Sequence, residues 1–197
     1  MKTRILLTVA AAALSVSINA SAQGDRYFGL DYGQSSLDTG VSNLTGTAKL
    51  DEKDSSFKLL FGTKINNNLA IEGIYVDFGE AALTGNPGDT FDSLGSTWVF
   101  ASSATVKVNA TGFGANVKGI LPISDSLSAY GLAGLIVWDG KSVVNGVSVG
   151  DNGSDLFYGA GVSYDLTESM SLDLSLESYT LGDLGVTRSN LGFTASF

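Results

Sequence analysis

One stretch of the chain constrains its fold more than any other: Gly112–Trp138, in which side chains alternate in character on both sides of a short polar turn at Pro122–Ser126. Successive side chains of a β-strand point to opposite faces, so this alternation gives each strand one apolar or small face. These faces are formed by Phe113, Ala115, Val117, Gly119 and Leu121, and by Leu127, Ala129, Gly131, Ala133, Leu135 and Val137. The segment therefore predicts a β-hairpin. A soluble sandwich would turn the apolar face inward, and a membrane barrel would turn it toward lipid.

The N-terminal segment has the features of a secretory signal. Met1–Arg4 is basic, an apolar run follows from Ile5 to about Val16, and Ala20–Ala22 places small residues at a cleavage position. We expect cleavage after Ala22, which assigns residues 1–22 to a signal peptide and leaves 23–197 as a single mature domain. A transmembrane anchor is the alternative, but it would need about 20 apolar residues, more than this run provides.

The composition narrows the class of protein. The chain has 20 Asp plus Glu against 11 Lys plus Arg, which argues against nucleic acid as a partner. The 25 Gly against 2 Pro suit closely packed strands, and there is no Cys to form the disulfides of small exported domains. Beyond the signal no segment is apolar enough for a membrane helix. Either a soluble exported domain or a barrel would satisfy these observations.

The C-terminal strand favours the barrel. Leu191, Phe193, Ala195 and Phe197 occupy alternate positions, and the sequence ends on Phe197. This ending resembles the C-terminal signal that the assembly machinery of bacterial outer-membrane barrels recognises. We therefore predict that Phe197 and Phe193 act as an assembly signal, with the barrel assembly machinery as a partner of the last strand.

The rest of the chain repeats the alternating pattern. It predicts eight strands, near 26–34, 54–64, 69–79, 108–121, 127–138, 154–165, 169–180 and 187–197. Tight turns at 65–68, 122–126 and 165–169 alternate with longer connections near 35–53, 80–107, 139–153 and 181–186. This alternation predicts an all-β fold, an eight-stranded antiparallel up-and-down transmembrane barrel with its long loops outside the cell. Within the second long connection, Thr97–Phe100 and Thr105–Val108 have strand-like sequences, so the fourth strand is expected to project as a ribbon.

Several short runs resemble the OmpA-like outer-membrane β-barrel family. They are Asn67–Tyr75, Lys118–Ser124, Gly159–Leu166 and the closing Leu191–Phe193. The resemblance covers the whole mature chain and implies a location in the outer membrane of a Gram-negative bacterium, in contact with lipid and lipopolysaccharide. The sequence shows no counterpart of the separate peptidoglycan-binding domain of larger OmpA proteins, so a cell-wall tethering role is not implied.

The two faces of the predicted strands carry different side chains. Counted from the short turns, the outward aromatics share heights, which predicts two interfacial girdles: Tyr32, Phe57, Tyr75, Phe113 and Tyr158 form one, and Phe61, Tyr164 and Phe197 the other. Charged residues gather at inward parity: Asp31, Lys58, Glu72, Lys118, Asp173, Glu177 and Arg188. Equal heights on neighbouring strands predict the pairs Asp31–Lys58, Glu72–Lys118 and Glu177–Arg188, with Asp173 joining the nearest base.

These charges allow two interpretations of function. Eight strands leave an interior that side chains can fill, so the charges form either a solid polar core or a narrow, gated ion path. The first favours a non-enzymatic surface protein that contributes to envelope integrity and binds a surface ligand of host, phage or other cells through its loops. The second favours a low-conductance, porin-like channel.

Catalysis and metal binding find little support. The chain has no His, on which outer-membrane barrel enzymes such as the lipid A acyltransferases, phospholipases and omptin proteases rely, and no Ser has an evident base beside it. Asp151–Asp155 superficially resembles a calcium loop but lacks a downstream bidentate Glu, so an ordinary turn is expected there. We therefore predict no catalytic, metal-binding or cofactor-binding residues.

Overall fold

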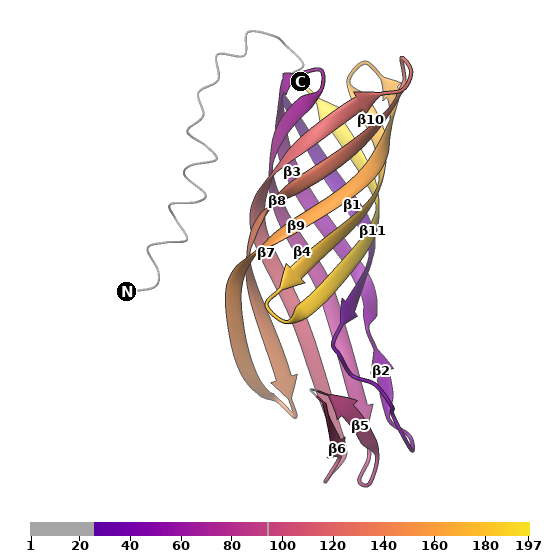
Figure 1. The fold of residues 1–197 in the computed structure, drawn as a ribbon, viewed down its shortest axis with the longest axis vertical. Coiled ribbons are helices and arrows are strands. Elements are labelled where there is room, and N and C mark those ends of the chain that lie inside the picture. Colours follow the sequence, from indigo (N-terminus) through magenta and orange to yellow (C-terminus); the bar gives the residue numbers. More distant parts are fainter. Residues whose placement is uncertain (1–25, 94) are drawn as a thin grey trace, which may run out of the picture.

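The protein folds into a single closed barrel of antiparallel strands, as a computed structural model that describes residues 26–93 and 95–197 shows (Figure 1). The predicted signal peptide, 1–22, lies outside the described residues. No helix within the described residues is long and apolar enough to cross a membrane. The barrel strands are β1 (Arg26–Asp38), β3 (Lys53–Asn66), β4 (Leu69–Gly85), β7 (Ala104–Pro122), β8 (Leu127–Val144), β9 (Val147–Thr167), β10 (Met170–Leu181) and β11 (Leu184–Ser196).

Every barrel strand pairs with the strands before and after it in the chain, and β1 pairs with β11 to close the ring. The predicted fold class, an eight-stranded antiparallel barrel, is confirmed. Closure matters physically because it leaves the barrel wall without the unpaired backbone that lipid cannot hydrogen-bond.

The direction of the side chains decides between the sandwich and the barrel. The apolar face of the strands points outward: Leu135, Phe113 and Leu176 each expose 60–64% of their surface. The charged face points inward, where Arg188, Glu177 and Glu72 are buried. A soluble protein would bury the leucines and expose the charges, so the alternation is that of a membrane barrel.

The turns at the end that carries the C-terminus are short, as predicted: residues 67–68, 123–126 and 168–169 join the strands there. At the opposite end two predictions are wrong. The connection near 139–153 is a continuation of β8 and β9, which meet at a two-residue turn, Asn145–Gly146, and the connection near 181–186 is a two-residue turn at Gly182–Asp183. Asn145 and Gly146 both have positive φ, and Asn-Gly favours such hairpin turns.

Four neighbouring strands, β4, β7, β8 and β9, extend beyond the others and form a tall wall on one side (Figure 1). The expected ribbon at Thr105–Val108 is part of this wall, since β7 begins at Ala104. β4 enters the wall through a bulge, where the pairing shifts between Asp77 and Glu80 and Gly79 adopts φ +75°. That conformation favours glycine, so the bend is encoded at this position.

Two smaller elements flank the tall wall. β2 (Lys49–Asp51) pairs with residues 82–84 of β4, and β5 (Thr90–Ser93) and β6 (Ser96–Val99) form a hairpin within the connection from β4 to β7. The strand-like pattern at Thr97–Phe100 therefore corresponds to β6. The remaining long connections are 39–52 and 86–103.

The orientation in the membrane follows from this asymmetry. Outer-membrane barrels carry their long loops outside the cell and their short turns in the periplasm, so we expect 39–52 and 86–103 to lie outside the cell. An epitope inserted near Gly88 should therefore be stained by antibody on intact cells, whereas one in the 123–126 turn should be stained only after permeabilisation. The reverse staining pattern would show that the barrel is inserted the other way up.

Candidate functional site

The interior charges form a connected network at the middle of the barrel. Lys58 lies between two acids: its Nζ is 2.7 Å from Asp31 Oδ2 and also contacts Glu177 Oε1. The other carboxylate oxygen of Glu177, Oε2, accepts a hydrogen bond from Arg188 Nη1 at 3.0 Å. These side chains are almost completely buried, so each charge depends on its partners rather than on water.

Lys118 forms the second half of the network. Its Nζ lies 3.6 Å from Glu72 Oε1 and 3.7 Å from Asp173 Oδ1, and it sits 3.9 Å from the centre of the Tyr130 ring. All three predicted pairs, Asp31–Lys58, Glu72–Lys118 and Glu177–Arg188, are therefore present, and Asp173 joins Lys118. Sequence heights did not reveal the bridges across the lumen, Lys58–Glu177 and Lys118–Asp173, which join strands that are not neighbours.

Neutral polar side chains complete the network. Glu72 accepts hydrogen bonds from the Tyr27 hydroxyl at 2.7 Å and from Asn116 Nδ2 at 2.8 Å. The Tyr179 hydroxyl donates to Glu177 at 2.7 Å, and Thr194 Oγ1 donates to Asp173 at 2.9 Å. Such bonds offset part of the cost of burying a carboxylate. The sequence placed these neutral side chains on the inward face, but without a charge they were not predicted to belong to the network.

Space for the acids comes from a glycine. Gly192 on β11 lies directly opposite both Asp31 on β1 and Asp173 on β10. A Cβ at this position would collide with the Asp31 carboxylate and approach Asp173 Cβ to 3.3 Å. The absence of a side chain therefore allows two carboxyl groups to point into the same part of the lumen.

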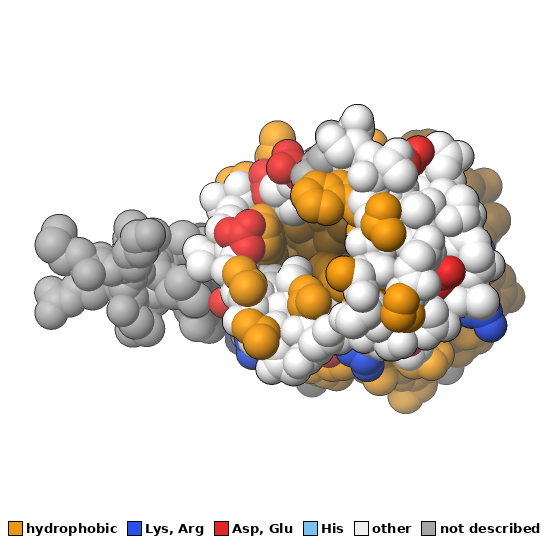
Figure 2. Space-filling model, turned by 90° about the horizontal axis from the view of Figure 1, so that it is seen from below, with side chains coloured by type: hydrophobic (Ala, Val, Ile, Leu, Met, Phe, Trp, Pro, Cys, Tyr) orange, Lys and Arg blue, Asp and Glu red, His pale blue; other side chains and the backbone are white. Residues whose placement is uncertain are grey.

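Above the charges, toward the long-loop end, the interior is apolar. Tyr179 stacks on Phe157 with ring centroids 4.7 Å apart and meets Phe78 edge-on at 4.9 Å. Leu37 and Trp138 belong to the same buried cluster. Figure 2 shows this end as a hollow with hydrophobic side chains along its walls. This layer was not predicted from the sequence, although Leu37, Phe78 and Tyr179 share the inward parity of Asp31, Glu72 and Glu177 on the same strands.

The two long loops are joined at the rim by the carboxylates of Asp89 and Asp92. Asp89 accepts hydrogen bonds from the backbone N–H of Asn86 at 2.9 Å and from the hydroxyl and N–H of Thr47 at 2.7 and 3.1 Å. Asp92 makes a second link, since it accepts from Asn43 Nδ2 at 2.7 Å and exchanges backbone hydrogen bonds with Ser42. These hydrogen bonds join residues 42–47 of the first long loop to residues 86–92 of the second, so the two segments present one surface.

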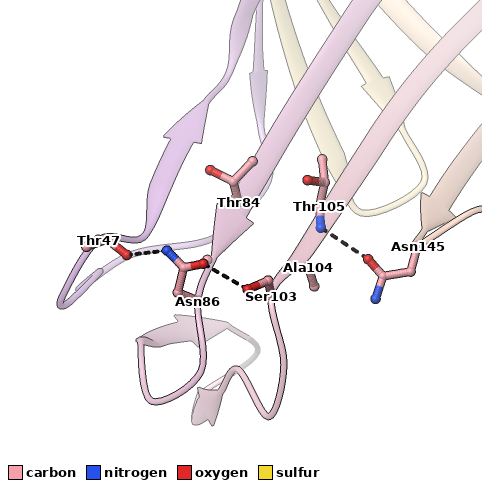
Figure 3. Close-up of a pocket in the computed structure, with 8 residues that line it drawn as sticks. Thr47, Thr84, Asn86, Ser103, Ala104, Thr105 and Asn145 are labelled. Atoms are coloured by element: carbon pink, nitrogen blue, oxygen red, sulfur yellow. Dashed lines mark hydrogen bonds between the residues drawn. The ribbon is translucent and has the colours of Figure 1, made fainter.

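A polar pocket of about 260 Å³ opens beside this surface (Figure 3). Asn86 spans its floor, donating to Thr47 Oγ1 and accepting from Ser103 Oγ, each at 2.9 Å. Asn145 closes the far side, with its Oδ1 3.4 Å from the Thr105 N–H. The side chains that line the pocket are uncharged.

The loop clamp makes a testable prediction. Hydrogen bonds from the Asn86 N–H and from Thr47 hold the pKa of Asp89 below its ordinary value. A carboxyl with a lowered pKa stabilises the clamp at neutral pH and loses that contribution as pH falls below about 4. Asp89→Ala should speed hydrogen–deuterium exchange of 39–52 and 86–103 at pH 7, and Asp51→Ala should not. Unchanged exchange in Asp89→Ala would contradict the clamp.

Six of the outward aromatics lie beside one another, as the girdle pattern predicts. Tyr32 is paired with Phe57, and Tyr75 with Phe113, whose ring centroid is 4.7 Å from that of Tyr75. At the short-turn end Phe61 lies 6.3 Å from Phe197. Phe197 is exposed directly after β11, and its N–H donates to the carbonyl of Arg26 on β1 at 2.9 Å.

The role of Phe197 and Phe193 as an assembly signal stays a prediction. Phe197 lies on the lipid-facing surface, so Phe197→Ser should lower the stability of the folded barrel no more than Leu191→Ser, a polar substitution on the same face. If the residue acts in recognition, the yield of folded barrel in cells should fall several-fold. Yield is measured as protease-resistant protein in the outer-membrane fraction, with Leu191→Ser as the comparison on the same face. Wild-type yield in Phe197→Ser would contradict the role.

The segment Asp151–Asp155, expected to be an ordinary turn, is instead part of β9. Its Asp155 accepts hydrogen bonds from Trp138 Nε1 at 2.8 Å and from the Gly182 N–H at 2.9 Å. This carboxylate therefore fixes the β10–β11 turn against the barrel rim. No group of three or more His, Cys, Asp or Glu suited to a metal ion occurs in the part of the chain that the structure describes.

A family model described as "Outer membrane protein beta-barrel domain" matches residues 6–197. No curated protein matches the chain significantly. Among solved structures, the chain resembles Ail, the attachment invasion locus protein of Yersinia pestis, at 22% identity and a TM-score of 0.55, covering 89% of this chain and 100% of Ail.

Two further structures share the fold. Neisserial surface protein A has 15% identity and a TM-score of 0.62, with 88% of this chain and 97% of that chain covered. The N-terminal β-barrel domain of Pseudomonas aeruginosa OprF has 12% identity and a TM-score of 0.58, with 89% and 100% covered. At these identities the similarity shows a shared fold alone.

Proposed function

The chain belongs to the outer membrane protein beta-barrel domain family, and from that premise we propose that it is a non-enzymatic surface protein that binds other molecules through its extracellular end. It is a protein of the cell outer membrane. The observation that carries the proposal is the contrast between a filled interior and an elaborate, ordered rim.

The filled interior disfavours transport. Ion pairs cross the lumen from Lys58 to Glu177 and from Lys118 to Asp173, and the stacked rings of Phe157 and Tyr179 lie above them. An ion passing along the axis would have to displace buried, mutually paired charges and an apolar layer. Both are costly, which supports a solid core over a gated path.

The rim, by contrast, is built for contact. The wall of β4, β7, β8 and β9 rises above the bilayer, and the Asp89 and Asp92 hydrogen bonds order both long loops. An ordered surface loses less conformational entropy on binding than flexible loops would. The outward apolar band and its aromatics anchor the barrel in lipid and lipopolysaccharide, which also supports a contribution to envelope integrity.

The charge of the protein and the uncharged lining of the rim pocket limit the class of ligand that the rim can bind. Ail, of similar fold, was crystallised with the heparin analogue sucrose octasulfate. The present chain is strongly acidic overall, and uncharged side chains line its rim pocket. A sulfated polyanion would meet repulsion here, so neutral or cationic surface ligands suit this protein better.

Loop shortening tests the proposal. Cells expressing the wild type and variants in which 40–47 or 87–101 is replaced by Gly-Ser should be compared for adhesion to cultured host cells and to a panel of bacterial cells. The shortened variants should lose most of the adhesion with folded protein unchanged. Equal adhesion by all variants, at equal surface levels, would contradict a loop-mediated role.

A further inference from the structure

The tall wall ends in an unprotected sheet edge. Residues Val147–Leu156 of β9 pair on one side with β8, but β10 begins to pair with β9 only at Phe157, opposite Tyr179. Within the described residues, no strand pairs with the other side of this stretch, although the Asp155 carboxylate near its C-terminal end accepts a hydrogen bond from the Gly182 N–H. Figure 1 shows the β8–β9 hairpin reaching past the turn between β10 and β11. Alternate backbone N–H and C=O groups along this stretch are therefore open to water.

The opposite end of the same wall is treated differently. There β2 pairs with residues 82–84 of β4 and so covers the edge. Natural sheets usually protect exposed edges with Pro, charged side chains, bulges or a covering segment. The stretch Val147–Leu156 contains no Pro and no Lys, and its pairing with β8 is continuous, without a bulge. Its two charges are Asp151 and Asp155, and the Asp155 carboxylate is held by Trp138 Nε1 and the Gly182 N–H. The edge is left in a form that accepts another strand.

The edge lies outside the bilayer. Tyr158 belongs to the outer aromatics, and the stretch 147–156 lies beyond it toward the hairpin tip. Asp139 and Lys141 on β8 are paired with Asn152 and Gly150 and are exposed on the outer surface, where lipid would not tolerate their charges. The edge is therefore accessible from the extracellular solution.

From these observations, and resting on the proposed surface role, we propose that β9 binds an extended, cationic peptide segment of a partner protein by adding it to the sheet as a further strand. Backbone hydrogen bonds to residues 147–154 would supply the affinity. Side chains of β9 that alternate on the inner face, Val147, Val149 and Asp151, would select the sequence.

The charge of the edge identifies the occupant. Asp151 makes no ion pair in the described structure, and Asp139 adds a second acid on the outer face against the single base Lys141. Val147 and Val149 are 69% and 65% exposed beside the edge. The matching strand therefore has apolar β-branched residues opposite the valines and Lys or Arg opposite Asp151.

A second copy of the chain fits less well. Two barrels upright in one membrane present β9 in the same direction, so a symmetric pair would be parallel and in register. That arrangement sets Asp151 beside Asp151 of the other copy, and like charges side by side destabilise strand pairing. The electrostatics thus favour a cationic partner over self-association.

The test uses full-length protein in lipid nanodiscs and a synthetic probe, Thr-Val-Thr-Lys-Thr-Val-Thr-Val, designed to pair antiparallel with residues 154 to 147. Fluorescence anisotropy of the labelled probe should show saturable binding. A probe methylated at alternate backbone nitrogens keeps its side chains but loses its donors, and its binding should disappear. Equal binding by the two probes would overturn strand addition.

Charge reversal tests the specificity. Asp151→Lys should weaken binding of the probe about tenfold, because a cross-strand attraction becomes a repulsion, and should bind a probe with Glu in place of Lys more tightly than the wild type does. Asp125→Lys makes the same charge change in a short turn and should bind like the wild type. If Asp151→Lys does not fold, Asp151→Asn should still weaken binding about threefold. Unchanged affinity in the Asp151 variants would overturn the assignment.

The adhesion assay tests the surface role and the probe assay tests the edge site, so one proposal can be contradicted without the other. Loss of adhesion on loop shortening together with no probe binding would leave the surface role standing and remove the edge site. Probe binding that requires Asp151 and free backbone donors would support the edge site. The absence of both would overturn both proposals.

Discussion

Replacing Glu177 with Gln should lower the free energy of unfolding by about 3–5 kcal/mol, the cost of leaving a buried charge without its partner. Glu177 holds Lys58 on one oxygen and Arg188 on the other. Lys58 retains Asp31 in the variant, but Arg188, whose side chain is 0% exposed, loses its acid. Urea titration in lipid vesicles, followed by fluorescence of Trp138 and Trp98, measures the change.

Glu80→Gln is the matched control. It removes the exposed ion pair with Lys107, whose Nζ–Oε1 separation is 2.8 Å, comparable to the distances in the core. Because exposed pairs contribute about 0–1 kcal/mol, this variant should be nearly as stable as the wild type. If Glu177→Gln were no less stable than Glu80→Gln, the interior network would be no more important to stability than a surface pair.

The second large effect is expected at Lys118. Lys118→Met leaves Asp173 without a base and Glu72 without its nearest cation, and should cost about 3 kcal/mol. The value lies at the low end for a buried pair because the Lys118 side chain is 13% exposed, and because Glu72 keeps hydrogen bonds from Tyr27 and Asn116.

The double variant Lys118→Met/Glu72→Gln should recover part of this loss, since it also removes the uncompensated carboxylate at Glu72. Recovery should be incomplete because Asp173 still lacks its base, and adding Asp173→Asn should restore more. The same urea titration measures all three variants. A double variant no more stable than Lys118→Met would show that Glu72 and Lys118 are not energetic partners.

The success of the pair predictions has a simple physical basis. Strand side chains alternate with a period of two, so parity identifies the inward charges, and residues at similar heights on neighbouring strands meet. Asp31 and Lys58 are directly opposite, as are Glu177 and Arg188. Glu72 is opposite Asn116 rather than Lys118, but the long lysine side chain spans the offset of two residues.

Contacts across the lumen could not be predicted in the same way. Whether Lys58 reaches Glu177 depends on barrel closure and shear, which combine small twists over all eight strands. The position of Tyr179 in the apolar layer was predictable, because Tyr179 shares the inward parity of Glu177 on β10. Phe157 lies on β9, where no inward charge of the network indicates which face is inward.

The errors at the long-loop end arose from turn chemistry. Asn145–Gly146 is a strong hairpin signal, yet the polar composition of 139–153 suggested a loop instead. Extending β8 and β9 through that segment creates the tall wall and its free edge. The segment that carries the proposed binding edge, 147–156, was therefore partly mispredicted as a loop.

The proposed function requires this barrel to be a closed scaffold for a binding surface rather than a pore. Planar-bilayer recording of the purified wild-type protein distinguishes the two. The packed core of Lys58, Glu177 and Arg188 beneath the rings of Phe157 and Tyr179 predicts no sustained single-channel conductance. A persistent small conductance in the wild type, abolished or altered by Glu177→Gln, would contradict the account and establish an ion path through the network.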